Sequence, residues 1–160
     1  MADINRDIII REALDSNAQD IVAIIREAMT IYASESGISG ILPSLKETEE
    51  DISRYIREDK VLIAESGKMI AGTIRIREVS ATEAEISRFA VLPAFHKSGM
   101  GSRLFIAAEE EIIKAGYESI TLHTSLDNRK LLNFYISRGF VVESQSLSNG
   151  YRRGALRKRL

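Results

Sequence analysis

Apolar and polar side chains alternate along several short segments of the chain, which is the spacing of a strand with one buried face. Between Met69 and Val79, for example, Ile74 and Ile76 alternate with Arg75 and Arg77. Glycine-containing turns separate such segments. The pattern predicts strands over residues 8–11, 61–65, 69–79, 83–91, 119–123, 140–146 and 151–159.

Other segments repeat their apolar residues every three or four positions, as helices do. The pattern predicts helices from Asp15 or Ser16 to about Tyr32, from Glu47 to Glu58, from Ser102 to Ala115, and from Asp127 or Asn128 to Gly139. The third helix has the clearest apolar stripe. We expect Leu104, Phe105, Ala108 and Ile112 on that stripe, Glu109, Glu110 and Glu111 mostly outside it, and Gly116 as its left-handed cap.

The order of these elements predicts a mixed α/β sheet. Antiparallel hairpins stand at both ends, and the helix after residue 101 connects two strands that should run parallel in the middle. The last hairpin turns at Ser148-Asn149-Gly150, where Asn-Gly is a strong turn signal. No linker or repeat divides the 160 residues, so we expect a single domain over residues 1–160.

Composition narrows the class of protein. Hydrophobic residues make up 44% and charged residues 28%, which is ordinary for a globular protein, and the net charge of −1 gives no reason to expect nucleic acid as a partner. The absence of cysteine excludes disulfides, thiolate zinc sites and cysteine nucleophiles. Without a membrane-length apolar run, a signal peptide or a metal motif, we expect a cytoplasmic protein with no membrane partner and no metal. We interpret the acidic run 47–51 and the basic tail 151–160 as solvated.

The segment 85–101 holds the most informative pattern: a strand that stops at Pro93, a short turn with Gly99 and Gly101, and then a helix. The free N–H groups and the dipole at a helix start attract anions, and glycine lets the backbone approach a phosphate closely. The spacing fits neither a P-loop nor a Rossmann fingerprint, because Leu104 stands where the latter needs a third glycine.

Two motifs carry a resemblance to the GNAT superfamily of N-acetyltransferases. The run His96-Lys97-Ser98-Gly99-Met100-Gly101 resembles its acyl-CoA loop, Gln/Arg-x-x-Gly-x-Gly/Ala, with His96 in place of Gln or Arg. The second signature of the superfamily resembles residues 128–140: Asn128, a helix that ends in Phe134-Tyr135, and then Gly139-Phe140. Two signatures in the right order and at the right distance are far more specific than either one alone.

The resemblance implies the GNAT fold: a mixed, mostly antiparallel sheet in which two central parallel strands splay apart, flanked by four helices. It implies acetyl-CoA as the cosubstrate, with the pyrophosphate on the loop and the pantetheine amides paired to the backbone of the strand before it. The residues that the resemblance assigns to the cofactor are Phe89, Ala90, Val91, His96, Lys97, Ser98, Gly99, Met100, Gly101, Ser102, Asn128 and Tyr135. Asn128 could instead, or also, cap the helix that follows it.

For catalysis, the resemblance implies that Tyr135 protonates the sulfur of CoA and that Glu85 is the base, directly or through water. The alternatives without a catalytic role are that Tyr135 is an aromatic packing residue and that Glu85 is an exposed strand carboxylate. Strict alternation would place Glu83, Glu85, Ser87 and Phe89 on one face and Ala84, Ile86, Arg88 and Ala90 on the other, but the family commonly has a bulge here that changes the phase. Because no serine–histidine–acid motif occurs, direct attack of the amine in a ternary complex suits the sequence better than a covalent enzyme intermediate.

The acceptor is poorly specified. Candidate residues are Tyr32, Glu35, Arg75, Arg77 and Tyr151. Acidic residues suit a cationic amine, and the arginines suit one that carries a carboxylate. We expect a small-molecule primary amine; a peptide or protein acceptor, a non-catalytic acyl-CoA-binding sensor, and a homodimer are left open.

Overall fold

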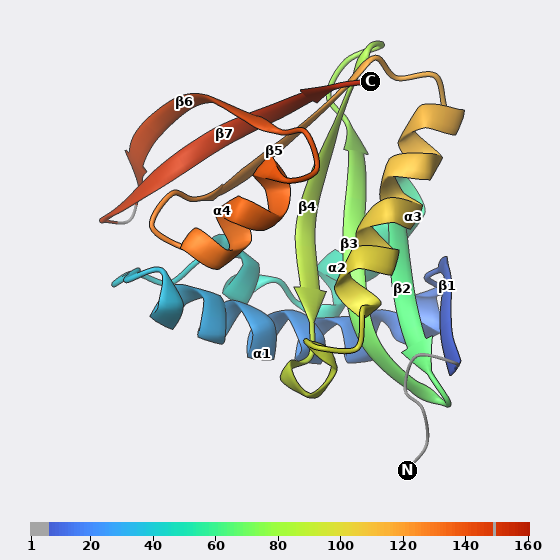
Figure 1. Cartoon of the computed structure of the whole chain (residues 1–160). Coiled ribbons are helices and arrows are strands. Elements are labelled where there is room, and N and C mark those ends of the chain that lie inside the picture. The colour runs from blue at the N-terminus through green and yellow to red at the C-terminus, as the bar shows by residue number, and fades with distance from the viewer. Residues whose placement is uncertain (1–6, 149) are drawn as a thin grey trace.

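A computed structural model describes residues 7–148 and 150–160, which form one seven-stranded sheet in the order β1-β2-β3-β4-β5-β7-β6 (Figure 1). Along the chain, the main elements are β1 (Ile8–Glu12), α1 (Ala18–Glu35), α2 (Glu49–Glu58), β2 (Lys60–Ser66), β3 (Met69–Glu78), β4 (Glu83–Val91), α3 (Met100–Lys114), β5 (Ser119–Ser125), α4 (Arg129–Ile136), β6 (Val141–Ser148) and β7 (Tyr151–Arg159). Each predicted helix and strand is present in the predicted order. The turn predicted at Ser148-Asn149-Gly150 includes Asn149, which lies outside the described residues.

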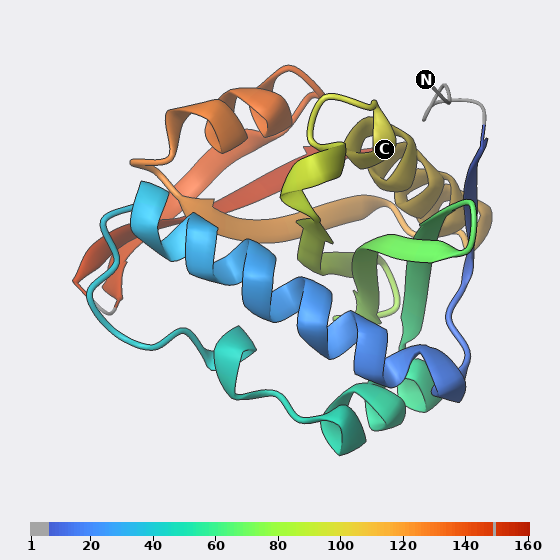
Figure 2. The same ribbon diagram turned by 90° about the horizontal axis from the view of Figure 1, so that it is seen from below.

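Helices cover both faces of the sheet. Helices α3 and α4 pack on one face and α1 and α2 on the other, as the view along the layers shows (Figure 2). The predicted stripe of α3 forms the centre of the first core, where Leu104, Phe105 and Ala108 are fully buried. Ile21, Ile24 and the other apolar residues of α1 form a second, smaller core. The face under α3 and α4 is therefore apolar over most of its area.

The centre of the sheet contains its only parallel pair among the described strands. Strand β4 pairs with β5 at three positions, from Glu83 opposite Ser119 to Glu85 opposite Thr121, and the two strands then separate. All the other described pairs are antiparallel. This is the mixed sheet that the sequence pattern predicted, with the splayed central strands that the resemblance implied.

A β-bulge changes the phase of β4 just beyond that separation. Arg75 of β3 lies opposite Ser87, but Thr73 lies opposite Ala90, so β4 contains one extra residue. Arg88 adopts φ 51° there. The bulge places Phe89 on the α3 side and Arg88 on the same face as Ser87. Strict alternation therefore fails from Arg88 onward, and the change of phase is the one expected from a bulge at this place.

Two predicted helix starts also differ from the structure. Neither Asp15 nor Ser16 caps α1, because residues 15–17 form a 3-10 turn and the side chain of Asn17 accepts hydrogen bonds from Leu14 and Arg11. Helix α2 begins at Glu49 behind the cap residue Thr48. Glu47 lies outside the helix and is buried, so the acidic run is not simply a solvated helix start.

The basic tail is also less exposed than predicted, because β7 is an internal strand between β5 and β6. Leu156 is fully buried, and Lys158 donates to Glu109 of α3 at 2.5 Å. Glu109 is buried, so its predicted place outside the stripe is wrong: the lysine of a distant strand gives it a partner.

Candidate active site

The loop before α3 presents free backbone donors. Gly99 caps the helix at φ 83°, a conformation that glycine adopts without strain. Within the described residues, the backbone N–H groups of Gly101 and Ser102 make no hydrogen bond, as expected in a first helical turn. The Ser98 hydroxyl donates to the Phe95 carbonyl at 2.6 Å and accepts from the Met100 N–H at 3.2 Å, which fixes the turn. The loop is therefore an ordered cradle that suits an anion.

His96 is exposed, and its imidazole turns toward the end of β4. Its Nε2 lies 2.9 Å from the carbonyl oxygen of Val91. The neighbouring N–H of Leu92 donates to Ala71 of β3, so the backbone groups of Val91 face the opposite way, toward the side on which β4 and β5 diverge. The imidazole thus holds the loop against the end of β4. Lys97 is exposed at the tip of the turn.

Tyr135 lies in an aromatic cluster beneath α4. Its ring centroid is 5.5 Å from that of Phe134, 5.7 Å from Phe105 and 6.1 Å from Phe140. Burial raises the pKa of the Tyr135 hydroxyl above its usual value, so it keeps its proton at neutral pH. No described residue forms a hydrogen bond with that hydroxyl. The ring packs in the apolar core, and the hydroxyl has no hydrogen-bond partner among the described residues, so the catalytic role of Tyr135 stays a prediction.

The C-terminal end of α1 is hydrogen-bonded to the end of β5 and to the start of α4. The Tyr32 hydroxyl accepts from the Ser125 N–H at the end of β5, at 2.8 Å, and burial raises the pKa of Tyr32. Asn128 caps α4 by accepting from Leu131 at 3.2 Å and donates to Ser36. The helix-cap interpretation of Asn128 is therefore confirmed, while its contact with the CoA arm stays a prediction.

Glu85 lies on the sheet face that carries Ser87 and Arg88, which we call the polar face. It accepts from Arg77 at 3.1 Å, and its Oε2 lies 4.0 Å from Nδ1 of His123 on β5. Burial, together with the nearby charge of Arg153, lowers the pKa of His123, and Glu85 opposes this only in part. His123 is consequently neutral at pH 7. Glu85 is a half-buried carboxylate with a neutral imidazole beside it.

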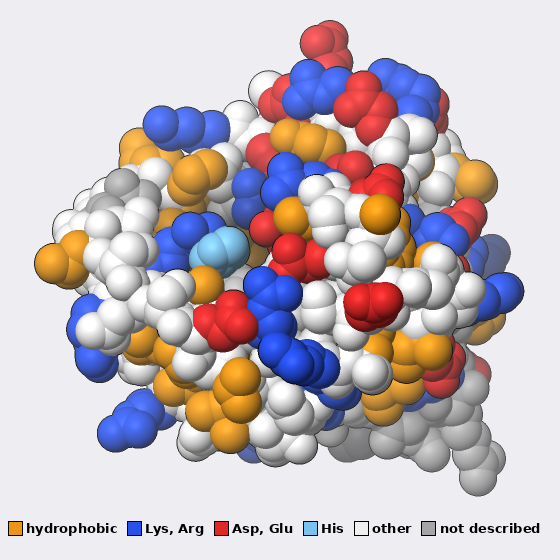
Figure 3. All heavy atoms as spheres, turned by 90° about the horizontal axis from the view of Figure 1, so that it is seen from above, with side chains coloured by type: hydrophobic (Ala, Val, Ile, Leu, Met, Phe, Trp, Pro, Cys, Tyr) orange, Lys and Arg blue, Asp and Glu red, His pale blue; other side chains and the backbone are white. Residues whose placement is uncertain are grey.

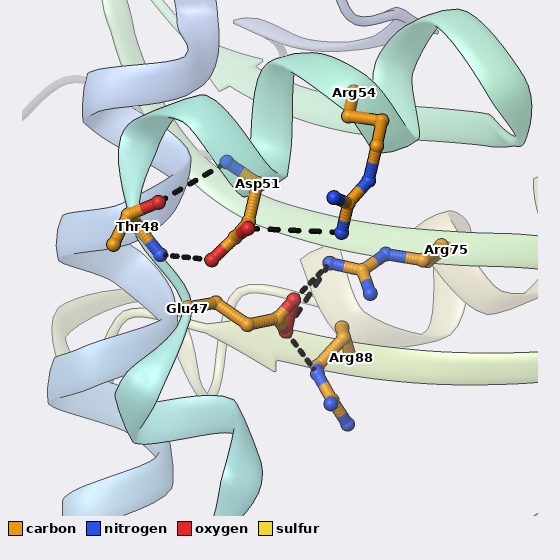
Figure 4. A network of polar contacts seen from close by, with 6 residues as sticks. All are labelled: Glu47, Thr48, Asp51, Arg54, Arg75 and Arg88. Carbon is orange, nitrogen blue, oxygen red and sulfur yellow. Dashed lines mark hydrogen bonds and ion pairs between the residues drawn. The ribbon is translucent and has the colours of Figure 1, made fainter.

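A buried ion cluster borders the polar face where β4 bulges. Glu47 accepts from Arg75 at 3.0 Å and from Nε of Arg88 at 2.5 Å (Figure 4). The guanidinium of Arg75 also stacks on Tyr55, 3.8 Å from the ring centroid. Thr48 and Asp51 cap each other in the adjacent turn, so the cluster fixes the start of α2 to β3 and β4.

Sequence reasoning missed several residues of this region. His123 becomes a neighbour of Glu85 through the register of the parallel pair, which no local motif reports. Arg138 donates to Ser102 at 2.8 Å and stacks on Phe134, which places a second basic residue beside the loop. Glu47 was part of a charge run and carried no further signal. Of the predicted acceptor residues, Arg75 is buried in the Glu47 cluster and Arg77 is paired with Glu85.

The comparisons with known proteins agree with this geometry. A model of the acetyltransferase (GNAT) family matches residues 25–140. The chain superposes with a TM-score of 0.81 on PaiA N-acetyltransferase from Thermoplasma acidophilum in complex with coenzyme A, at 20% identity over 96% of this chain and 99% of that one. No sequence among the curated proteins matches this chain.

Two other solved structures have a similar fold. One is yncA from Salmonella typhimurium with its cofactor acetyl-CoA, with a TM-score of 0.77 and 16% identity over 96% of this chain and 94% of that one. The other is aminoglycoside 6'-acetyltransferase type Ii, with a TM-score of 0.74 and 21% identity over 94% of this chain and 96% of that one. At these identities the likeness shows the fold.

The family match spans most of the chain, and the splayed strands with the glycine loop define the same class. The protein belongs to the acetyltransferase (GNAT) family and is a GNAT N-acetyltransferase. Membership implies acetyl-CoA as acyl donor and an amine as acceptor.

Three further observations concern possible partners. Among residues 7–148 and 150–160, no helix is both long and apolar enough to cross a membrane. The same residues include no group of three or more His, Asp or Glu side chains arranged to hold a metal ion. Basic and acidic side chains are interleaved on the surface seen in Figure 3, with a histidine among them.

Proposed function

We propose that this protein transfers the acetyl group of acetyl-CoA to the primary amine of a small molecule, by direct attack within a ternary complex. One observation carries the proposal: the loop with free N–H groups begins α3 directly after the segment of β4 that has separated from β5. A ligand that enters between the two strands therefore reaches N–H groups that can bind an anion at one end, and the polar face at the other end.

The loop fits the pyrophosphate of the cofactor. A Cβ at Gly101 would meet Phe89 at 3.5 Å and Val91 at 3.8 Å, which is ordinary contact, so packing within the chain does not require glycine there. The missing side chain is better explained by a ligand that approaches the backbone. Gly101 and Ser102 would donate to the phosphates, with charge from Lys97 and Arg138. His96 would act by holding the loop against Val91.

The backbone of β4 beyond the bulge fits the pantetheine arm. Phe89 packs its ring on Phe105, at 5.5 Å between centroids, and leaves its main chain at the gap. Ala90 and Val91 continue the strand with small or buried side chains. Acetyl-CoA supplies the thioester whose acetyl group is transferred; these residues would bind and orient it.

Tyr135 and Glu85 fit the two proton transfers. Tyr135 would donate its proton to the departing thiolate, because the phenol is protonated at neutral pH and no described residue competes for that hydrogen. Glu85 would accept the proton of the amine, directly or through water. His123, being neutral, places no positive charge beside Glu85 at pH 7.

The test is release of free CoA thiol from acetyl-CoA across a panel of small amines and short peptides. Acetylation of small amines supports the proposal if double-reciprocal plots of the initial rates, with both substrates varied, give intersecting lines. Parallel lines in those plots would require an acyl-enzyme. Faster acetylation of peptides would move the acceptor to that class. Tight acetyl-CoA binding without any transfer would identify a sensor, and the assembly state, for which a homodimer remains a prediction, is measured separately by sedimentation.

A further inference from the structure

We infer that Arg88 binds a carboxylate of the acceptor, so that the acceptor is a small amine that also carries a carboxylate, such as an amino acid. This rests on the proposed function, because it names the substrate class of the same site.

Arg88 is held in a strained conformation. Its φ of 51° is the only positive φ outside glycine among the described residues. A left-handed conformation costs an L-residue roughly 1–2 kcal/mol, and such strain is concentrated at functional sites. Here the strain accompanies the bulge that moves the Arg88 side chain onto the polar face, beyond the last residue at which β4 pairs with β5.

The partners of Arg88 leave its binding edge free. Only Nε donates to Glu47, and the terminal nitrogens are directed away from that carboxylate (Figure 4). Within the described part of the chain they have no partner. Arg75, by contrast, is enclosed: 7% of its side chain is exposed, against 29% for Arg88, and Tyr55 covers its guanidinium. Glu47 therefore anchors both arginines, but only Arg88 can reach a ligand.

The surrounding charges favour an anionic group. Arg77 is neutralised by Glu85, and Glu47 is already shared by two guanidiniums. Arg153, opposite Ser125 on β7, forms no ion pair with any described residue, and its charge lowers the pKa of His123. Glu47 carries one negative charge for the two positive charges of Arg75 and Arg88, and Arg153 has no ion-pair partner among the described residues, so net positive charge lies on both sides of the Glu85–His123 pair.

A carboxylate matches the free edge of a guanidinium, because its two oxygens can accept two parallel N–H bonds. Glu85 and Arg88 are three residues apart on β4, about 10 Å along an extended strand, and the bulge shortens this span. Two long side chains on one face can therefore reach the amine and the carboxylate of one small molecule.

The experiment compares amino acids with their amides as acceptors in the thiol-release assay. For the wild-type protein, we expect kcat/KM to be at least about tenfold higher for the carboxylate of each matched pair, roughly the difference that one charge-assisted contact makes. Arg88→Gly relieves the strain at φ 51°, so it should fold; it should raise KM for the carboxylates about tenfold and leave the amides unchanged. Arg88→Lys keeps the charge but loses the paired N–H donors of the guanidinium, so its KM for the carboxylates should lie between those of wild type and Arg88→Gly.

Arg54→Gln is the matched control, because Arg54 is an exposed arginine of the adjacent α2 and should not affect the preference. Equal rates with carboxylates and amides, or an unchanged preference in Arg88→Gly, would overturn the inference and leave the acetyltransferase function in place. If no amine is acetylated, calorimetry of the amino acids on the CoA-loaded protein decides: Arg88-dependent binding supports the inference while the proposed function fails, and no binding ends both.

Discussion

The loop before α3 and the polar face of the sheet present different groups to a ligand: backbone N–H groups in the loop, and side chains on the polar face. The loop presents backbone N–H groups, with glycines at 99 and 101, and most of its side chains point away or fix the turn. The polar face presents side chains from four elements, held by ion pairs such as Glu47 with Arg75. Backbone donors suit any pyrophosphate, whereas side chains can differ from one acceptor to the next. The first region should therefore define the family and the second the individual enzyme.

The two regions should respond differently to mutation. Substitutions in the loop should alter ligand binding and spare the fold, because the N–H groups of Gly101 and Ser102 make no contact within the described chain. Removal of Glu47 should instead alter stability, because it would leave the buried Arg75 without its carboxylate.

The largest effect is expected from Gly101→Asp. The carboxylate would occupy the cradle and repel the pyrophosphate, so calorimetry should detect no CoA binding. The fold should survive, because the position has room for a Cβ. Gly101→Ala, which adds bulk without charge, should bind CoA more weakly than wild type but measurably. A folded Asp variant with wild-type affinity would remove the phosphate from this loop.

Next comes Tyr135→Phe, which removes one hydroxyl from the aromatic cluster and keeps the ring. If Tyr135 protonates the leaving thiolate, turnover should fall about 10²–10⁴-fold while CoA affinity and thermal stability barely change. Steady-state rates with a good amine acceptor measure this. Full activity would return Tyr135 to a packing role alone.

On the polar face, Glu47→Ala should lower the free energy of unfolding by about 3–5 kcal/mol, because it leaves Arg75 buried without its carboxylate. Urea denaturation measures the loss. Glu49→Ala, at an exposed position two residues along, should change stability little. Similar stability in the two variants would mean that the cluster does not hold α2 to the sheet.

The smallest effect concerns pH. Below the lowered pKa of His123, the imidazolium forms beside Glu85 and weakens it as a base, so kcat/KM should fall. The midpoint should therefore lie below the ordinary histidine value of about 6.5. In His123→Asn, which cannot form an imidazolium, this fall should be absent. A midpoint at or above 6.5, or the same profile in the variant, contradicts this role.

Local chemistry explains why so much of the first region could be predicted. Gly116, Asn128 and Gly139 act within a few residues of their own position, as a left-handed cap, a helix N-cap and a helix end, and the structure confirms each. The order of the elements along the chain followed from the periodicity of apolar residues, and the parallel pair in the middle of the sheet from the crossover helix. These features need no knowledge of which distant segments meet.

The polar face depends on tertiary register, which the sequence does not display. Glu47 appeared to be one of several acidic residues, and only packing against Arg75 and Arg88 distinguishes it. His123 reaches Glu85 because two parallel strands pair at three positions and no further. The side of the sheet that Arg88 occupies depends on one extra residue in β4. Small differences of alignment therefore decide the chemistry of this face.

The most direct measurement of the central claim follows an isotopic label from acetyl-CoA into product by mass spectrometry, in a single turnover with an amine acceptor. Transfer to the amine predicts that the label appears in the N-acetyl product at the rate of thiol release, with none left on the protein. Label that appears only in free acetate, or that accumulates on a side chain, would contradict direct N-acetyl transfer at this site.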